Sequence, residues 1–349
     1  MKKQKYTVAV IGTGRIGFSL GFDSKREQPA SHTMAVNNNK RLKLIAACDK
    51  DMSNLEYFKR FNKNVRTYSD TSLLFAAEKP DIVIIAVNEE SHLDVSLSAL
   101  KAGVKLIILE KPVALTVSQS LKIQEEALKR NIPVMVNHER RFSKDYIEAK
   151  KNLSRIGEII SVNARLDSGL KVYSLESEKN GGYSLLHDGT HLVDSVKFLL
   201  EGNLSSDSEF SKITLTGLLK DSKEAMTARY VSFKAVLPNV SEVNFQISGK
   251  SRYFGFEIDI MGTEGRLRIG NALCDFFVRK ESKLYSGFYS LEKDKKIRLN
   301  KKTGYFSNMI QNAVDFLDGT AELKSPLSEG IKTLKVLEEV KKQIKNSFY

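Results

Sequence analysis

The sequence contains little cysteine and no long apolar segment, and both shortages narrow the class of protein. Its two cysteines, Cys48 and Cys274, are too few and too far apart for a disulfide framework or a metal cluster. No apolar run approaches the roughly 20 residues of a membrane-spanning helix. The lysine-rich start of the chain also lacks the apolar core of a signal peptide. We therefore expect a cytoplasmic protein without a membrane partner.

Basic residues outnumber acidic ones, but they form no long basic run. The chain has 55 Lys and Arg against 42 Asp and Glu, a net charge of +13. Neither a basic helix nor a stacking-aromatic motif accompanies this charge, so we expect no nucleic acid as a partner. The positive field either favours an anionic cofactor or substrate, or only reflects a lysine-rich solvated surface. The length of 349 residues suits two domains.

A glycine motif follows the first apolar strand, which we place at residues 7–11. The motif has the pattern G-x-G-x-x-G, whose glycines permit a tight turn and let backbone amides approach a pyrophosphate. It consists of Gly12, Thr13, Gly14, Arg15, Ile16 and Gly17. The sequence therefore predicts a dinucleotide site at the end of this strand.

An acidic residue, Asp49, follows the next predicted strand at residues 43–48. Its carboxylate can accept hydrogen bonds from ribose hydroxyls and would repel a 2′-phosphate, which favours NAD over NADP. Alternatively, Asp49 only opens a turn or caps the following helix. The interval from the motif to Asp49 exceeds the usual interval of about 20 residues, because residues 18–31 look like an insertion. We expect this loop to form part of the rim of the substrate cleft.

Strands and helices alternate up to residue 138, which predicts an α/β fold with a doubly wound parallel sheet over residues 1–138. Ligands bind beyond the carboxyl ends of such strands. The residues at these ends are Val87, Asn88 and His92 after one apolar strand, and Glu110 and Lys111 after the next. Pro112 restricts Lys111 to an extended backbone. Lys111 is then either held over a cleft or an ordinary exposed lysine.

The pattern changes after His138, and residues 139–349 predict a second, α+β domain. Short strands at close spacing between residues 159 and 269 indicate an open, mostly antiparallel sheet with helices on one face. Two amphipathic segments, 304–317 and 327–345, predict helices that close this domain.

A segment with two histidines in the second domain is another candidate for chemistry. Residues 185–200 have helical periodicity, which would place His187 and His191 on one face. Asp188 or Asp194 could hold the His191 ring and select its tautomer. Three interpretations of this segment stay open. It is a general acid–base site, a zinc site formed by the two histidines, or two polar histidines without a chemical role on a partly buried helix. Zinc lacks a clear third ligand, so we expect no metal. Gly189 indicates that something approaches the backbone closely.

These features together resemble the Gfo/Idh/MocA oxidoreductases (glucose-fructose oxidoreductase, inositol dehydrogenase, rhizopine catabolism protein). The resemblance covers nearly the whole chain. It rests on the glycine motif, on Ala102-Gly103 with Glu110-Lys111-Pro112, on Arg140-Arg141-Phe142 and on the segment 181–191. It implies a Rossmann domain, a second α/β domain with an open sheet, and a homodimer or homotetramer. It also implies NAD(P)-dependent oxidation or reduction of sugars, inositols or nucleotide sugars.

The resemblance also implies roles for single residues. The family lysine falls on Lys111 and the family catalytic histidine on His191. The family often has aspartate four residues before that histidine, where this chain has His187 beside Asp188. The stretch Asn137-His138-Glu139 departs from the glycine–aromatic wording that is commoner in the family. Candidates for substrate contact or proton relay are His187, His138, Arg141 and Asp188.

We therefore expect hydride transfer between a secondary alcohol and nicotinamide. His191 would remove the hydroxyl proton, and Lys111 would stabilise negative charge on that oxygen. Two alternatives stay open. One is an enzyme that uses bound NAD transiently, for glycoside hydrolysis or internal redox of a nucleotide sugar. The other is a regulator that binds the cofactor without chemistry.

Overall fold

The computed structural model describes residues 5–202, 209–221 and 226–348, and the chain divides into two compact units. The first unit contains Met1–Ser143 and Lys302–Ile331, and the second contains Lys144–Lys301 and Lys332–Tyr349. The chain therefore leaves the first unit near Ser143 and later returns to it. None of the helices in the described part of the chain is long and apolar enough to cross a bilayer.

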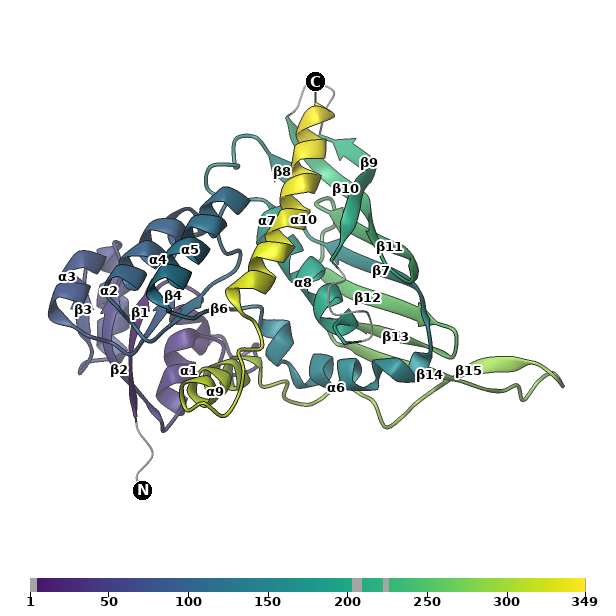
Figure 1. The fold of residues 1–349 in the computed structure, drawn as a ribbon, viewed down its shortest axis with the longest axis horizontal. Coiled ribbons are helices and arrows are strands. Elements are labelled where there is room, and N and C mark those ends of the chain that lie inside the picture. The colour runs from purple at the N-terminus through teal and green to yellow at the C-terminus, as the bar shows by residue number, and fades with distance from the viewer. Residues whose placement is uncertain (1–4, 203–208, 222–225, 349) are drawn as a thin grey trace. The chain divides into compact units, whose positions relative to one another are not determined.

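A six-stranded parallel sheet forms the centre of the first unit, which confirms the predicted α/β fold (Figure 1). Its strands lie in the order β3-β2-β1-β4-β5-β6, so the chain reverses direction across the sheet after β3, between β1 and β4. Ligands of such sheets bind where the strand order reverses. The strands are β1 (Tyr6–Ile11), β2 (Leu42–Cys48), β3 (Arg66–Tyr68), β4 (Ile82–Ile85), β5 (Leu106–Leu109) and β6 (Val134–Val136).

Helices cover both faces of this sheet. Figure 1 shows α4 and α5 over one face and α1 with α9 over the other. The helices of the unit are η1 (Ser19–Phe22), α1 (His32–Asn38), α2 (Met52–Phe61), α3 (Thr71–Ala77), η2 (Glu89–Ser91), α4 (His92–Lys101), α5 (Val117–Arg130), η3 (Glu139–Phe142) and α9 (Tyr305–Leu317). The sequence analysis predicted this alternation of strands and helices, and its segment 304–317 matches α9 within one residue.

Side chains along each strand enter two separate hydrophobic clusters, one on each face. Ile82 and Ile84 of β4 enter one cluster, whereas Val83 and Ile85 enter the other. This alternation follows from the two-residue period of a strand. Because both faces are buried, the strands contain almost only apolar residues, which is the pattern that the sequence showed.

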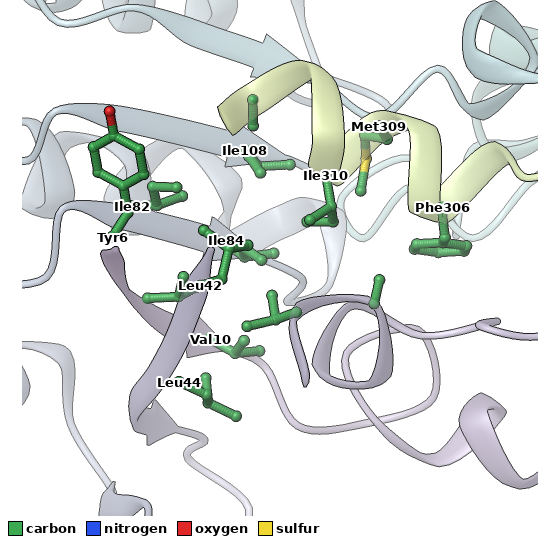
Figure 2. Packing of buried hydrophobic residues seen from close by; sticks show 14 of the residues in the cluster. Tyr6, Val10, Leu42, Leu44, Ile82, Ile84, Ile108, Phe306, Met309 and Ile310 are labelled. Carbon is green, nitrogen blue, oxygen red and sulfur yellow. The ribbon is translucent and has the colours of Figure 1, made fainter. Parts of the chain in front are cut away.

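Helix α9 completes the first of these clusters although it lies far along the chain. Figure 2 shows Phe306, Met309 and Ile310 of α9 packed with Ile84 of β4 and Ile108 of β5. The sequence analysis placed this helix among those that close the second domain. Its amphipathic pattern predicted a buried face, but periodicity does not say which sheet that face covers.

The second unit contains a nine-stranded sheet, and helices α6 and α8 lie along it (Figure 1). All strand pairs are antiparallel except β7 with β11, which confirms a mostly antiparallel sheet. The strands are β7 (Ile159–Asp167), β8 (Tyr173–Ser174), β9 (Ser211–Lys220), β10 (Thr227–Leu237), β11 (Val240–Ser248), β12 (Gly255–Gly262), β13 (Gly265–Gly270), β14 (Leu273–Glu281) and β15 (Tyr289–Lys293). The sequence analysis did not assign β8, β14 or β15.

The helices of the second unit follow the amphipathic segments of the sequence. They are α6 (Lys144–Asn152), η4 (Leu153–Ile156), α7 (Ser184–His187), α8 (Gly189–Leu200) and α10 (Leu327–Asn346), of which the first turn belongs to the first unit. The predicted helix at 327–345 is therefore confirmed, and the chain passes from one unit to the other within it.

The predicted insertion interrupts the helix that would normally continue from the glycine motif. His32 N donates to Ile16 O at 3.0 Å, and Thr33 N donates to Gly17 O at 3.0 Å. These bonds join the start of α1 to the turn at residues 14–17. Phe18 N also donates to Gly14 O at 2.9 Å, so both ends of the insertion return to this turn. The inserted residues account for the long interval before Asp49.

Glu27 ties the insertion to the start of α9. Its carboxylate accepts hydrogen bonds from Thr303 N at 2.8 Å, Thr303 Oγ1 at 2.9 Å and Gly304 N at 2.7 Å. Gly304 itself offers no side chain to cap α9. A carboxylate at a helix N-terminus satisfies amides and interacts favourably with the helix dipole. Glu27 therefore caps α9 from a distant part of the sequence.

We expect Glu27→Ala to lower the free energy of unfolding by about 1 kcal/mol, the usual cost of a lost cap. Urea unfolding followed by circular dichroism measures this change. The matched control is Glu125→Ala, which removes the same charge from an exposed position on α5. Equal unfolding midpoints for the two variants would contradict the capping role.

Candidate functional site

At two positions of the motif, the packing of the backbone permits only glycine. Gly12 has φ +95°, and a Cβ there would lie 2.4 Å from Ala86 O. A Cβ on Gly17 would lie 1.9 Å from Gly12 O. Both positions bring backbone against backbone, which no other residue permits. They form the tight turn from β1 to the next helical segment.

Gly14 is different, because nothing in the protein requires a glycine there. The nearest heavy atom to a Cβ at this position is Asn54 Nδ2, at 3.8 Å. Among the described residues, no acceptor bonds the amides of Gly14, Arg15 and Ile16. Free amides beside an open position at a helical turn suit a phosphate. The motif therefore fits the pyrophosphate of a dinucleotide on the geometry of this chain.

Asp49 contacts the glycine motif directly. Its Oδ2 accepts from Thr13 N at 2.8 Å and from Thr13 Oγ1 at 3.1 Å. Its Oδ1 accepts from Asp51 N at 3.0 Å, which is the turn that the sequence analysis gave as an alternative role. A carboxylate oxygen has two acceptor positions, so the turn leaves Oδ1 capacity for a ribose hydroxyl. Both roles are compatible with this geometry.

His92 braces the loops that follow β4 and β5. Its Nδ1 lies 2.7 Å from Pro112 O, and its Nε2 lies 3.1 Å from Val87 O. Burial lowers the pKa of His92 below its ordinary value, although both carbonyls oppose that effect. Because both ring nitrogens face backbone carbonyls, the buried His92 ring connects the loops after β4 and β5 and stabilises them. The neighbouring Val87 and Asn88 are less buried.

Glu110 is a buried carboxylate at the end of β5 with two side-chain partners. Its Oε1 accepts from Asn137 Nδ2 at 2.6 Å and lies 2.7 Å from His32 Nε2. Burial opposes ionisation, but the hydrogen bond and charge of His32, the charge of Lys111 and the Asn137 amide outweigh it. Together they lower the pKa of Glu110 to about 2. Lys111 follows with a partly exposed side chain.

The sequence analysis did not find His32. It lies directly after the insertion and belongs to no motif, and 78 positions separate it from Glu110. The available signals were the helix start at Ser31, whose side chain caps α1, and the departure at Asn137 from the family wording. Neither signal indicates a contact with Glu110.

Arg141 and His138, both candidates for substrate contact, are buried beside the end of β6. Arg141 is 1% exposed, and its guanidinium lies 3.4 Å from both Lys324 O and Glu329 Oε2. These contacts connect η3 to Lys324, which precedes α10, and to Glu329 in the first turn of α10. They give Arg141 a structural role in the first unit. His138 is also 1% exposed.

The histidine segment of the second unit is two helices instead of one. Helix α7 ends at His187, and α8 begins at Gly189, with Asp188 between them. His191 N still donates to Asp188 O at 3.0 Å, so the two helices nearly continue each other. His187 is exposed, whereas His191 and Asp188 are partly buried.

Close packing accounts for Gly189. A Cβ there would lie 3.1 Å from Ile247 Cδ1 and 3.6 Å from Leu337 Cδ2. The predicted close approach to the backbone is therefore made by side chains of β11 and α10. No group of three or more His, Cys, Asp or Glu within the described ranges could hold a metal ion.

Three features define the first unit as a dinucleotide-binding Rossmann unit. They are a parallel sheet with reversed strand order, a glycine turn that accommodates a phosphate, and an acidic residue after β2. Residues 6–138 match the Gfo/Idh/MocA family model, described as "Oxidoreductase family, NAD-binding Rossmann fold". This match confirms the resemblance over residues 6–138.

Similarity to individual proteins extends this finding. The chain is 26% identical over 207 residues to D-glucoside 3-dehydrogenase of Escherichia coli K12, covering 57% of this chain and 55% of that protein. The match therefore spans about half the length of that relative. A crystal structure of a putative myo-inositol dehydrogenase from Sinorhizobium meliloti 1021 shares the fold, with TM-score 0.75, 18% identity and 98% coverage of both chains.

The same fold also occurs in a protein described as a repressor. The super-repressor mutant of Gal80p from Saccharomyces cerevisiae has a TM-score of 0.77 and 17% identity, covering 98% of this chain and 97% of that one. At this identity the likeness concerns the fold alone. The fold therefore does not decide between an enzyme and a regulator.

We expect Gly14→Ala to weaken NAD binding at least about tenfold, a loss of about 1.4 kcal/mol, with a thermal midpoint close to wild type. Alanine fits the backbone at this position, but its methyl group would occupy space that a phosphate needs. Gly12→Ala should instead lower the thermal midpoint, because it collides with Ala86 O. Isothermal titration calorimetry and differential scanning fluorimetry measure the two effects. Unchanged NAD affinity in Gly14→Ala would contradict the phosphate cradle.

Glu110 should contribute to the acid sensitivity of the protein. Its folded-state pKa of about 2 lies below the ordinary 4.5, so its stabilising effect is present above pH 4.5 and is lost as the pH falls towards 2. We expect Glu110→Gln to lose less unfolding free energy than wild type between pH 5 and pH 2. Urea unfolding at a series of pH values measures this difference. Parallel pH curves for the two proteins would contradict an ionised Glu110.

Proposed function

We propose that this protein is an NAD-dependent dehydrogenase that acts on a secondary alcohol of a sugar, inositol or nucleotide sugar. The observation that carries the proposal is the pairing of a phosphate-compatible glycine turn with Lys111, at the carboxyl ends of strands in the same sheet. The match of residues 6–138 to an NAD-binding oxidoreductase family supports it. The relative that oxidises a glucoside supports the class of substrate.

Lys111 is the proposed stabiliser of charge on the substrate oxygen. As the alcohol becomes a carbonyl, or the reverse, negative charge develops on that oxygen. An ammonium group held at the end of a rigid strand can donate a hydrogen bond to it without reorganising. Bound NAD would supply the hydride acceptor. The buried, ionised Glu110 immediately precedes Lys111 in the chain.

His191 is the proposed acid–base group. His191 is partly buried, and α8 holds its backbone. A histidine titrates near neutral pH, which suits it to accept the hydroxyl proton and return it in the reverse reaction. His187 and Asp188 precede it at the break between α7 and α8, and we retain them as substrate contacts. His138 is a weaker candidate because it is buried.

NAD is the proposed cofactor in preference to NADP. Asp49 presents a carboxylate at the end of β2, where a 2′-phosphate would meet a like charge. Its bonds with Thr13 hold the carboxylate in place. A homodimer or homotetramer remains our expectation from the family.

Two other functions compete with this proposal. An enzyme that uses NAD transiently would copurify with the cofactor and produce no net NADH. A regulator is favoured by one observation, the shared fold of Gal80p, and would bind ligands without turnover. Incubating the purified protein with NAD and a panel of sugars, inositols and UDP-sugars, and following NADH absorbance, separates the dehydrogenase from both alternatives. Release of copurified NAD on denaturation then separates the transient-NAD enzyme from the regulator.

We expect Lys111→Ala and His191→Ala each to lower kcat by about 100-fold or more, the usual range for groups that handle charge or protons. Neither variant should change the Kd for NAD. The double variant should lose little more than either single one if both residues act in one chemical step.

Lys105→Ala is the matched control, because Lys105 immediately precedes β5 as Lys111 follows it. Lys105 is half exposed and pairs with Asp81, so its loss should leave turnover near wild type. Near-normal turnover in Lys111→Ala or His191→Ala would contradict the assigned roles. Fully additive losses in the double variant would contradict a shared step.

A further inference from the structure

A buried polar cluster in the first unit joins the insertion, the end of β5 and the end of β6. It consists of His32, Glu110 and Asn137. One oxygen of Glu110 contacts both other side chains, at 2.7 Å and 2.6 Å, and the second oxygen accepts from Lys111 N at 3.3 Å. The carboxylate therefore connects the two buried side chains to the backbone of Lys111.

We propose that His32 and Asn137 are positioning residues, which act through the Glu110 carboxylate to hold Lys111 in place. This inference rests on the proposed function, in which Lys111 stabilises charge on the substrate oxygen. Two donors on one oxygen prevent the carboxylate from rotating, and they leave its other oxygen directed at the Lys111 amide. The same carboxylate keeps a negative charge next to the Lys111 ammonium.

The ionised state of Glu110 supports this role. Burial raises the free energy of a carboxylate, and only its partners reverse that effect and hold the pKa of Glu110 at about 2. A well-packed apolar cluster is often as stable as a buried ionic one. Stability alone therefore does not require a charge here instead of an apolar cluster, and the adjacent Lys111 is a group that benefits from the charge.

The hydrogen bonds also define how both partners are oriented. An ionised carboxylate only accepts, so His32 Nε2 must carry a hydrogen and Asn137 must present its amide nitrogen. Their other polar atoms, His32 Nδ1 and Asn137 Oδ1, are buried and have no hydrogen-bond partner among the described residues. Unpaired buried polar atoms lower the stability of the protein. Neither side chain has another side-chain hydrogen-bond partner among the described residues, so each directs its side-chain hydrogen bond to Glu110.

The way the chain places His32 adds a third argument. The bonds of His32 N and Thr33 N to the turn at Ile16 and Gly17 place the ring at the start of α1. The ring lies edge-on to Phe306, with centroids 5.1 Å apart and an interplanar angle of 84°. Glu27 binds the insertion to the same end of α9. Two independent contacts therefore hold the ring against Glu110.

A pair of amide substitutions tests the proposal. In His32→Gln the amide nitrogen can reach the position of Nε2, whereas in His32→Asn it reaches only that of Nδ1. We expect His32→Gln to keep kcat within about threefold of wild type, and His32→Asn and His32→Leu to lose at least about tenfold, because small misplacements of a catalytic group are costly. The Kd for NAD should not change in any of the three.

A second measurement does not need a substrate. Acylation of Lys111 by acetic anhydride, followed by mass spectrometry at one pH, reports how firmly its side chain is held and how exposed its amine is. We expect the rate to rise in His32→Asn, His32→Leu and Glu110→Gln, because a displaced Lys111 is more exposed, and to stay near wild type in His32→Gln. Lys105, at the other end of β5, is the internal control.

The two measurements separate failure of this inference from failure of the proposed function. If wild type oxidises no alcohol in the panel, the proposed function fails, but the acylation rates still decide the role of the cluster. Equal Lys111 rates in wild type, His32→Asn and Glu110→Gln would overturn the inference. So would a His32→Gln variant that behaves like His32→Asn. If His32→Leu does not fold, these remaining variants give the result.

Discussion

Burial of both faces of the six-stranded sheet is the constraint on which the first unit depends. It requires apolar side chains along each strand, and it excludes polar chemistry from the strands themselves. Polar residues therefore gather where strands end: Asp49 after β2, Asn88 in the loop after β4, Glu110 and Lys111 after β5, and Asn137 after β6. Because parallel strands run in one direction, these residues lie along one edge of the sheet, which is where ligands of this architecture bind.

Glu110 is an exception to this exclusion of polar groups from the buried part of the sheet. It immediately follows an apolar strand and is 6% exposed, yet it carries a charge. Partners from distant parts of the chain make this possible. The insertion, which begins as an interruption of a helix, returns at His32 against Glu110 and holds α9 through Glu27. A feature that the sequence presents as a surface loop is therefore part of the support for the end of β5.

The fold by itself leaves the activity open, since a repressor has the same architecture. Our proposal of an enzyme rests instead on the residues at the strand ends. A regulator needs a ligand site, but it has no need for a lysine held beside a buried carboxylate. The chain keeps both Lys111 and His191, and it departs from the family wording at Asn137 and His187. These departures lie next to the proposed catalytic residues, where differences in substrate would be expected.

Local patterns in the sequence determined much of this protein. Apolar strand runs, the glycine motif and the turn residues predicted the parallel sheet, the cofactor turn and the position of Lys111, because each depends on a few consecutive residues. Tertiary structure alone decided that α9 packs on the first sheet and that His32 reaches Glu110 from 78 positions away. It also decided that Arg141 is buried against Lys324 O and that Asp188 separates two helices. Periodicity shows that a face is apolar or that a residue is polar, but not which distant group it meets, since that depends on how the whole chain packs.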